Sequence, residues 1–360
     1  MQIGLVGLQY SGKTTLFNTL SKNNLDSTVS SKEETAIEVV KVPDERLDNL
    51  TKIFNPKKQV NATIEVFDIP GLKMSEDNKV KITSNFLTSV RNNESLFYVI
   101  RGFKDDSVAH PMNSINPFRD IEFLETEFLL SDLAFLETRL EKLKREVLKT
   151  KDEKLKRELP VIEKCLAHCE KELPLRTLHF DENEIKLLSG YQLLTLKSLA
   201  IAVNYDEGSI TGVENEIIHL KTKLEKSHAA IIPFFAKIEL ELSKLSEEDQ
   251  IAFMQDYGIK ESALSKILRT SYEMLGLQSF FTVGEDECRA WTIKKNYTAQ
   301  QAAGVIHTDF FNRFIRAEVV HYSDFIKHGT FHKCKEAGAW RLEGKEYIVK
   351  DGDILNIRHN

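Results

Sequence analysis

Five apolar runs of strand length recur along the chain, separated by stretches with helical periodicity. They are residues 2–8, 62–69 (ATIEVFDI), 95–101 (SLFYVIR), 198–204 (SLAIAVN) and 229–236 (AAIIPFFA). Apolar runs of this length are typical of strands buried on both faces. Because strands that alternate with helices form parallel sheets, the pattern predicts a fold of the α/β class with a parallel-rich sheet.

Residues 125–175 interrupt this rhythm with two apolar seams of spacing four and three. The first is Leu129, Leu133, Leu136, Leu140, Leu143 and Val147, and the second is Leu155, Leu159, Ile162, Leu166, Cys169 and Leu173. Heptad seams on either side of a polar stretch predict an antiparallel helical hairpin, a coiled coil inserted between two strands of the sheet. Pro160 is expected to interrupt the second helix or to mark its start.

The tip of this hairpin is basic. Residues 139–158 carry nine Lys or Arg, among them Lys149, Lys151 and Lys154, against five acids. The cluster is either a patch for RNA phosphates or the solvated face of a helix pair, and the sequence favours neither. Cys165 and Cys169 lie four apart on the second helix. We interpret them as one core cysteine and one incidental one rather than as a metal or redox pair, because no second ligand pair with zinc spacing accompanies them.

The chain changes character near its end. Residues 243–275 have a helical pattern, Gly276 is a stop signal, and short β-like runs with glycine turns follow. We therefore expect a nucleotide-binding domain over residues 1–276, the hairpin insertion over 125–175 and a small α+β domain over 277–360.

Composition excludes several classes of protein. The 360 residues carry a net charge of −6, so no global basic field favours nucleic acid. No apolar stretch is long enough to span a membrane, and the apolar start is too short for a secretion signal. Four cysteines in so long a chain do not indicate a disulfide framework, which favours a cytoplasmic location.

The strongest chemical signal is Gly7-Leu8-Gln9-Tyr10-Ser11-Gly12-Lys13-Thr14, which is followed by Thr15. It fits the pattern G-x-x-x-x-G-K-[ST] and lies between a strand and a helix, as a phosphate-binding loop must. Backbone N–H groups and the helix N-terminus would face the phosphates of a nucleotide. Lys13 is expected to reach the β- and γ-phosphates, and the Thr14 hydroxyl to coordinate Mg²⁺.

A second element follows the second predicted strand, at Asp68-Ile69-Pro70-Gly71. Asp68 is expected to hold Mg²⁺ through water, and Gly71 to offer its N–H to the γ-phosphate. The next residue is Leu72 rather than the glutamine that orients water in Ras-like proteins. Hydrolysis is therefore expected to be slow or to position water in another way.

The base site is predicted after the fourth and fifth strands. Asn204-Tyr205-Asp206-Glu207 stands where GTPases carry Asn-Lys-x-Asp, and Glu207 replaces the aspartate that reads guanine. This change favours ATP over GTP, with Asn204, Tyr205 and Glu207 at the purine. Ala236 and Lys237 are either the residues that pack against the base or an ordinary turn.

Taken together, these elements resemble the YchF subfamily of Obg-like P-loop NTPases. The likeness is clearest in 289–293 (RAWTI), 299–309 (AQQAAGVIHTD), 314–318 (FIRAE) and 351–353 (DGD). Asn204-x-x-Glu207 is similar to the altered base motif of that family, and Leu72 to its missing glutamine. The resemblance implies that residues 277–360 form a TGS domain with a β-grasp fold.

The resemblance also implies an activity and partners. It implies a monomeric, Mg²⁺-dependent ATPase that accepts GTP less well and acts as a switch in translation or the stress response. Its implied partner is the ribosome, through its large subunit or as a whole, with rRNA or tRNA contacts on the hairpin and the TGS domain.

The chain departs from the family at Gln9-Tyr10-Ser11 and in residues 73–85, which lack glycine. The first change places K⁺ dependence in question, and the second changes how this loop responds to the γ-phosphate. Near the expected magnesium-sensing position, Thr35 and Lys32 are alternatives. Three functions stay open: an ATP-hydrolysing switch, a nucleotide-binding adaptor with negligible turnover, and an RNA-binding module in which the nucleotide is structural.

Overall fold

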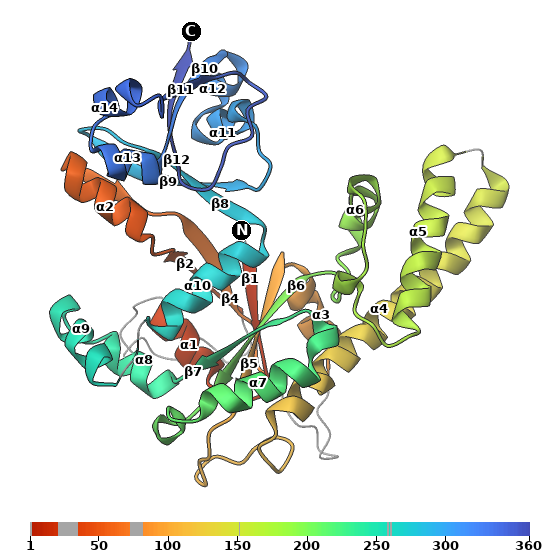
Figure 1. The fold of residues 1–360 in the computed structure, drawn as a ribbon. Coiled ribbons are helices and arrows are strands. Elements are labelled where there is room, and N and C mark those ends of the chain that lie inside the picture. Colours follow the sequence, from red (N-terminus) through yellow and green to blue (C-terminus); the bar gives the residue numbers. More distant parts are fainter. Residues whose placement is uncertain (1, 21–34, 73–81, 151, 258, 260) are drawn as a thin grey trace. The chain divides into compact units, whose positions relative to one another are not determined.

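The computed structural model describes residues 2–20, 35–72, 82–150, 152–257, 259 and 261–360 (Figure 1). They form two compact units, the first from Met1–Glu38 and Glu65–Ile267, the second from Val39–Ile64 and Leu268–Asn360. Each unit is described by itself below. Residues 73–81, Lys32 and Lys151, on which some expectations fall, lie outside the described residues.

A six-stranded sheet with the order β2-β4-β1-β5-β6-β7 organises the first unit. The strands are β1 (Gln2–Val6), β2 (Ala36–Lys41), β4 (Thr63–Asp68), β5 (Ser95–Arg101), β6 (Ser198–Asn204) and β7 (Ala230–Phe234). β1 pairs in parallel with β4 and β5, β5 with β6, and β6 with β7. All five predicted runs are strands of this sheet, so the α/β prediction is confirmed; β2 was not predicted.

Helices follow most of these strands. They are α1 (Lys13–Leu20), α3 (Ser84–Arg91), α4 (Pro117–Lys149), α5 (Glu153–Cys169), α6 (Glu182–Leu188), α7 (Val213–Lys223), α8 (Ala236–Leu242) and α9 (Glu247–Asp256). Apolar side chains of α3, α4 and α7 join those of the strands in one buried cluster, so these three helices pack on one face of the sheet. None of the helices among the described residues is long and apolar enough to span a membrane.

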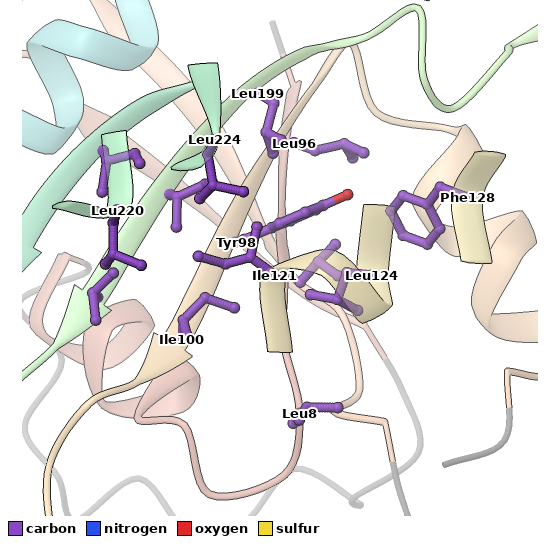
Figure 2. Packing of buried hydrophobic residues seen from close by; sticks show 14 of the residues in the cluster. Leu8, Leu96, Tyr98, Ile100, Ile121, Leu124, Phe128, Leu199, Leu220 and Leu224 are labelled. Carbon is purple, nitrogen blue, oxygen red and sulfur yellow. The ribbon is translucent and has the colours of Figure 1, made fainter. Parts of the chain in front are cut away.

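Tyr98 lies at the centre of this cluster (Figure 2). It belongs to β5, whose seven residues are all buried because neighbouring strands and helices enclose it. The Tyr98 ring meets Phe128 of α4 edge to face at 5.9 Å, and its hydroxyl donates to Glu125 Oε1 at 3.0 Å. A buried aromatic side chain of this kind contributes about 2–3 kcal/mol to folding, so Tyr98 anchors the base of α4 to the sheet.

The predicted helical hairpin is confirmed as α4 and α5, which lie side by side (Figure 1) and are inserted along the chain between β5 and β6. Their facing residues, including Leu136, Leu143 and Ile162, form a cluster of their own. Cys165 and Cys169 are buried in it, and burial raises the pKa of each thiol to about 12, which makes both unreactive core residues.

The expectation for Pro160 was wrong, because α5 begins at Glu153 and continues through it. Proline inside a helix removes one hydrogen bond and costs about 3 kcal/mol. The side chains of Leu159 and Ile162 continue the packing against α4 on both sides of this position. That burial offsets the cost of the proline, which is itself exposed.

The second unit contains a sheet with the order β11-β10-β12-β8-β9-β3. Its strands are β3 (Lys58–Val60), β8 (Leu277–Thr282), β9 (Glu287–Lys294), β10 (Phe314–His321), β11 (Arg341–Glu343) and β12 (Asp353–His359). The helices are α2 (Glu45–Phe54), α11 (Ala299–Ile306), α12 (Thr308–Asn312), α13 (Tyr322–His328) and α14 (Phe331–Glu336), while α10 (Ala263–Met274) contributes residues to both units. The α+β character predicted for residues 277–360 is confirmed.

The segment Val39–Ile64 belongs to this second unit, although the sequence placed it in the nucleotide-binding domain. β3 pairs in parallel with β9, and the Phe54 ring stacks on Phe325 at 5.4 Å. Arg46 of α2 donates to both carboxylate oxygens of Asp351, at 2.7 and 3.3 Å. This segment is therefore fixed to the C-terminal sheet by strand pairing, aromatic stacking and an ion pair.

Candidate functional site

The phosphate-binding loop connects β1, at the centre of the first sheet, to α1. β4 and β5 flank β1 on opposite sides, which makes the carboxyl end of β1 the point where strand order reverses and where open α/β sheets bind ligands. Gly12 has φ +92° in the left-handed region, and an added Cβ there would collide with the Asn204 amide. At Gly7 an added Cβ would collide with the Val99 carbonyl oxygen, so both positions need glycine.

Tyr10 is an unusual residue in this loop. Its φ is 63°, a conformation that side chains other than glycine rarely adopt, and it is 60% exposed. Such strain is often found at functional loops. The neighbouring Gln9 N–H donates to the Leu72 carbonyl at 3.0 Å, and the Leu72 N–H donates to the Gly7 carbonyl at 3.1 Å. These two bonds hold the residues after Asp68, including Gly71, beside the loop.

Lys13, Thr14 and Asp68 converge at the end of the loop. The Lys13 ammonium forms an ion pair with Asp68, and the Thr14 hydroxyl donates to Asp68 Oδ2 at 3.1 Å. Burial lowers the pKa of Lys13, while the charge of Asp68 opposes that effect. The structure thus brings Lys13 and Thr14 into contact with Asp68, although Asp68 lies 55 and 54 residues further along the chain.

These oxygen donors suit Mg²⁺. A magnesium ion in a nucleotide site takes only one or two protein oxygens, with phosphates and water completing its shell. The Thr14 hydroxyl and the Asp68 carboxylate meet that requirement, and both are oxygen ligands. Among the described residues there is no cluster of three or more His, Cys, Asp or Glu that would hold a metal by itself.

Asn204 has a role that the sequence did not indicate. Its Nδ2 donates to the Ser11 carbonyl at 3.1 Å, and its Oδ1 accepts from the Ala236 N–H at 3.1 Å. The side chain is 3% exposed. It therefore joins the phosphate-binding loop to the start of α8. A purine could bond only the second N–H of Nδ2 or the second lone pair of Oδ1.

The other residues predicted at the base differ in exposure. Tyr205 is buried in the core of the unit, with its ring 6.4 Å from Phe235, so the aromatic ring packs rather than faces solvent. Glu207 and Lys237 are exposed, as are the side chains of Thr14 and Tyr10. The contacts of all these residues with a nucleotide stay predictions.

A buried polar cluster between β5 and α4 was not predicted. His110 Nε2 lies 3.0 Å from Asp120 Oδ2, and Arg119 donates to the other oxygen of Asp120. Burial lowers the pKa of His110 and raises that of Asp120, and His110 Nδ1 accepts from the Met112 N–H at 3.1 Å. No residue spacing in the sequence could have revealed this pairing, because it depends on how loop 102–116 folds onto α4.

Two family models match separate parts of the chain. A model described as a 50S ribosome-binding GTPase matches residues 2–127. A model of the C-terminal domain of YchF GTPases, described as a protein of unknown function, matches residues 277–360. The first model ends within α4, and the second begins where β8 begins.

Whole-chain comparisons find relatives that match over nearly the full length. The chain is 39% identical over 363 residues to the ribosome-binding ATPase YchF of Pasteurella multocida, covering 99% of this chain and 98% of that protein. It is 36% identical to the protein of the same name in Bacillus subtilis, with the same coverage. The structure of the Schizosaccharomyces pombe YchF GTPase superposes with a TM-score of 0.85 at 32% identity, over 99% of this chain and 97% of that one. This similarity covers the loop at Gly7–Thr14, the hairpin and the C-terminal sheet in one alignment. The chain therefore belongs to the YchF family.

Proposed function

We propose that this protein hydrolyses ATP, with GTP as a less favoured substrate, and associates with the ribosome in the cytoplasm. The convergence of Lys13, Thr14 and Asp68 at the phosphate-binding loop carries the proposal. The names of the relatives support it, since curated members are called ribosome-binding ATPases. One matching family model is described as a GTPase, whereas the relatives are named ATPases. The proposed preference for ATP over GTP therefore rests on Glu207.

The chain's own residues divide the work at the phosphates. Backbone N–H groups of the loop and the N-terminus of α1 bind the phosphate oxygens. Lys13, released from Asp68, places its ammonium on the β- and γ-phosphates. Thr14 and Asp68 would hold a Mg²⁺ ion, which would supply positive charge to the phosphate oxygens. Gly71 is held beside the loop through Leu72, and we expect it to offer its N–H to the γ-phosphate.

Slow turnover is part of the proposal. Leu72 is buried and has no polar atom on its side chain, so it cannot orient an attacking water as a glutamine would. The alternative function, a nucleotide-binding adaptor with negligible turnover, draws its support from the same residue. Ribosomes would then be needed to separate a slow enzyme from an inactive one.

The test is ATP hydrolysis and ATP binding by purified protein, with and without ribosomes. Lys13→Ala should abolish binding of ATP, because it removes the charge aimed at the phosphates. Lys226→Ala, which removes an exposed lysine on the same unit, is the matched control and should bind normally. Phosphate release in neither condition would refute the ATPase, and tighter binding of GTP than of ATP would refute the base preference.

A further inference from the structure

Most of the basic residues in 139–158 are already paired with acids. Arg139 forms ion pairs with Glu146 and Glu158, and four others have acidic partners within 4 Å: Lys142 with Glu146, Lys144 with Glu163, Arg145 with Glu141, and Lys156 with Glu153. Within the described residues, Lys149, Lys154 and Arg157 have no ion pair. The available positive charge is therefore confined to the end of the hairpin.

Two of these cations line a groove between α5 and α6. The groove has a volume of 780 Å³, and Lys154 and Arg157 from α5 face it together with Lys186 from α6. Within the described part of the chain, Lys186 also has no ion pair. Val161 and Leu187 supply apolar surface to the same groove.

Hydrogen bonds that do not involve the three groove cations fix the position of α6 relative to α5. Lys164 of α5 donates to both oxygens of Glu184 on α6, at 2.9 and 3.0 Å, and to the His179 carbonyl at 2.8 Å. It also lies over the Phe180 ring at 4.8 Å. Replacing Lys154, Arg157 and Lys186 by neutral residues would therefore leave these contacts between α5 and α6 intact.

The carboxylates that line the groove are occupied. Glu153 accepts from Lys156 at 2.8 Å, Asp181 caps α6 by accepting from two backbone N–H groups, and Glu184 accepts from Lys164. These hydrogen bonds lower the pKa of all three carboxyl groups. Because the acids have local partners and, among the described residues, the three cations have no ion pair, the groove favours an anionic ligand.

We propose that the groove between α5 and α6 binds the phosphate backbone of RNA through Lys154, Arg157 and Lys186. Val161 and Leu187 would contact the sugar or the face of a base. This inference rests on the proposed ribosome association, since the anionic surface of a ribosome is largely RNA. It assigns that contact to the groove rather than to the whole basic stretch of residues 139–158.

The test compares two triple variants with equal loss of charge. The groove variant is Lys154→Gln, Arg157→Gln and Lys186→Gln; the control is Lys142→Gln, Lys144→Gln and Arg145→Gln, whose cations are already paired. Binding of a fluorescent single-stranded oligouridylate and co-sedimentation with ribosomes are measured between about 50 and 200 mM salt, the range over which phosphate contacts change affinity most. Far-ultraviolet circular dichroism and ATP affinity should stay unchanged in both variants, because none of these residues lies at the phosphate-binding loop.

Three phosphate contacts should account for a slope of about −2 in a plot of log affinity against log salt. The groove variant should lose that slope and bind the RNA about 100-fold more weakly at 0.1 M salt, whereas the control should change far less. Equal losses in both variants, or unchanged binding in the groove variant, would overturn the inference while the proposed ribosome association stands.

Two further outcomes separate the proposals. If polyglutamate displaced the protein from ribosomes better than RNA of equal charge, the occupant would be an acidic protein segment and the RNA assignment would be wrong. If the unaltered protein bound oligouridylate through the groove but did not sediment with ribosomes, the groove would be confirmed and the proposed ribosome association refuted.

Discussion

Replacing Asn204 by alanine should loosen the phosphate-binding loop without touching a phosphate ligand. In the folded protein the Asn204 amide bonds both the Ser11 carbonyl and the Ala236 N–H, and it is almost fully buried. Alanine would leave those two backbone groups without partners. Each such unpaired buried group costs about 1–3 kcal/mol.

Together the two losses should destabilise the first unit by about 3 kcal/mol, allowing for partial access of water to the opened loop. For a unit of this size, that corresponds to a fall in melting temperature of about 6–12 °C. The affinity for ATP should fall as well, because Ser11 and Gly12 belong to the loop that must already be shaped to receive phosphates.

The assay is thermal unfolding followed by circular dichroism, with ATP affinity measured on the same samples. Asn215→Ala is the control, since Asn215 is exposed in the first turn of α7 and its removal should change stability by no more than about 0.5 kcal/mol. If Asn204→Ala lowered ATP affinity but left the melting temperature equal to that of the control variant, Asn204 would act as a ligand of the base, and its assignment as a link between the phosphate-binding loop and α8 would be wrong.

Two further predictions concern groups away from the nucleotide. Glu239 is buried on α8, accepts from the Ala263 N–H at 2.6 Å, and has its pKa raised by burial from 4.5 to about 7. The folded state therefore keeps this proton while the unfolded state loses it, so the free energy of unfolding should fall by about 3 kcal/mol as the pH rises from 4.5 through 7. In Glu239→Gln this loss should be absent; urea unfolding at pH 5 and pH 8 measures it, and parallel pH dependence in both proteins would contradict the assignment. Arg46→Ala should destabilise the second unit by about 2 kcal/mol, since it removes charge-assisted hydrogen bonds and the contact with Phe281 at 5.2 Å. Hydrogen exchange should accelerate in α2 and β8 but not in β1, whereas Lys57→Ala, which breaks an exposed ion pair, should cost less than about 0.5 kcal/mol; equal effects of the two substitutions would refute the role given to Arg46.

Much of the fold was predictable because its signals are local. The run SLFYVIR becomes a strand because six apolar or small residues in succession, followed by Arg101, suit a position enclosed on both faces. The seam from Leu129 to Val147 lies on one helix because side chains three and four apart share a face. Pro160 shows the limit of this reasoning, since packing against α4 outweighed the local preference of proline.

The phosphate-binding loop, the central strands, the hairpin and the α+β character of the end of the chain were predictable, since each is encoded in adjacent residues. Which distant groups meet depends on the tertiary structure. It placed Asn204 against a carbonyl 193 residues away and joined Val39–Ile64 to the C-terminal sheet. It also paired Lys144 and Lys156 with acids but gave Lys154 and Arg157 no ion pair among the residues that the structure describes. The physical reason is that hydrogen bonds and ion pairs depend on distances of a few ångströms, and the fold sets these distances independently of separation along the chain.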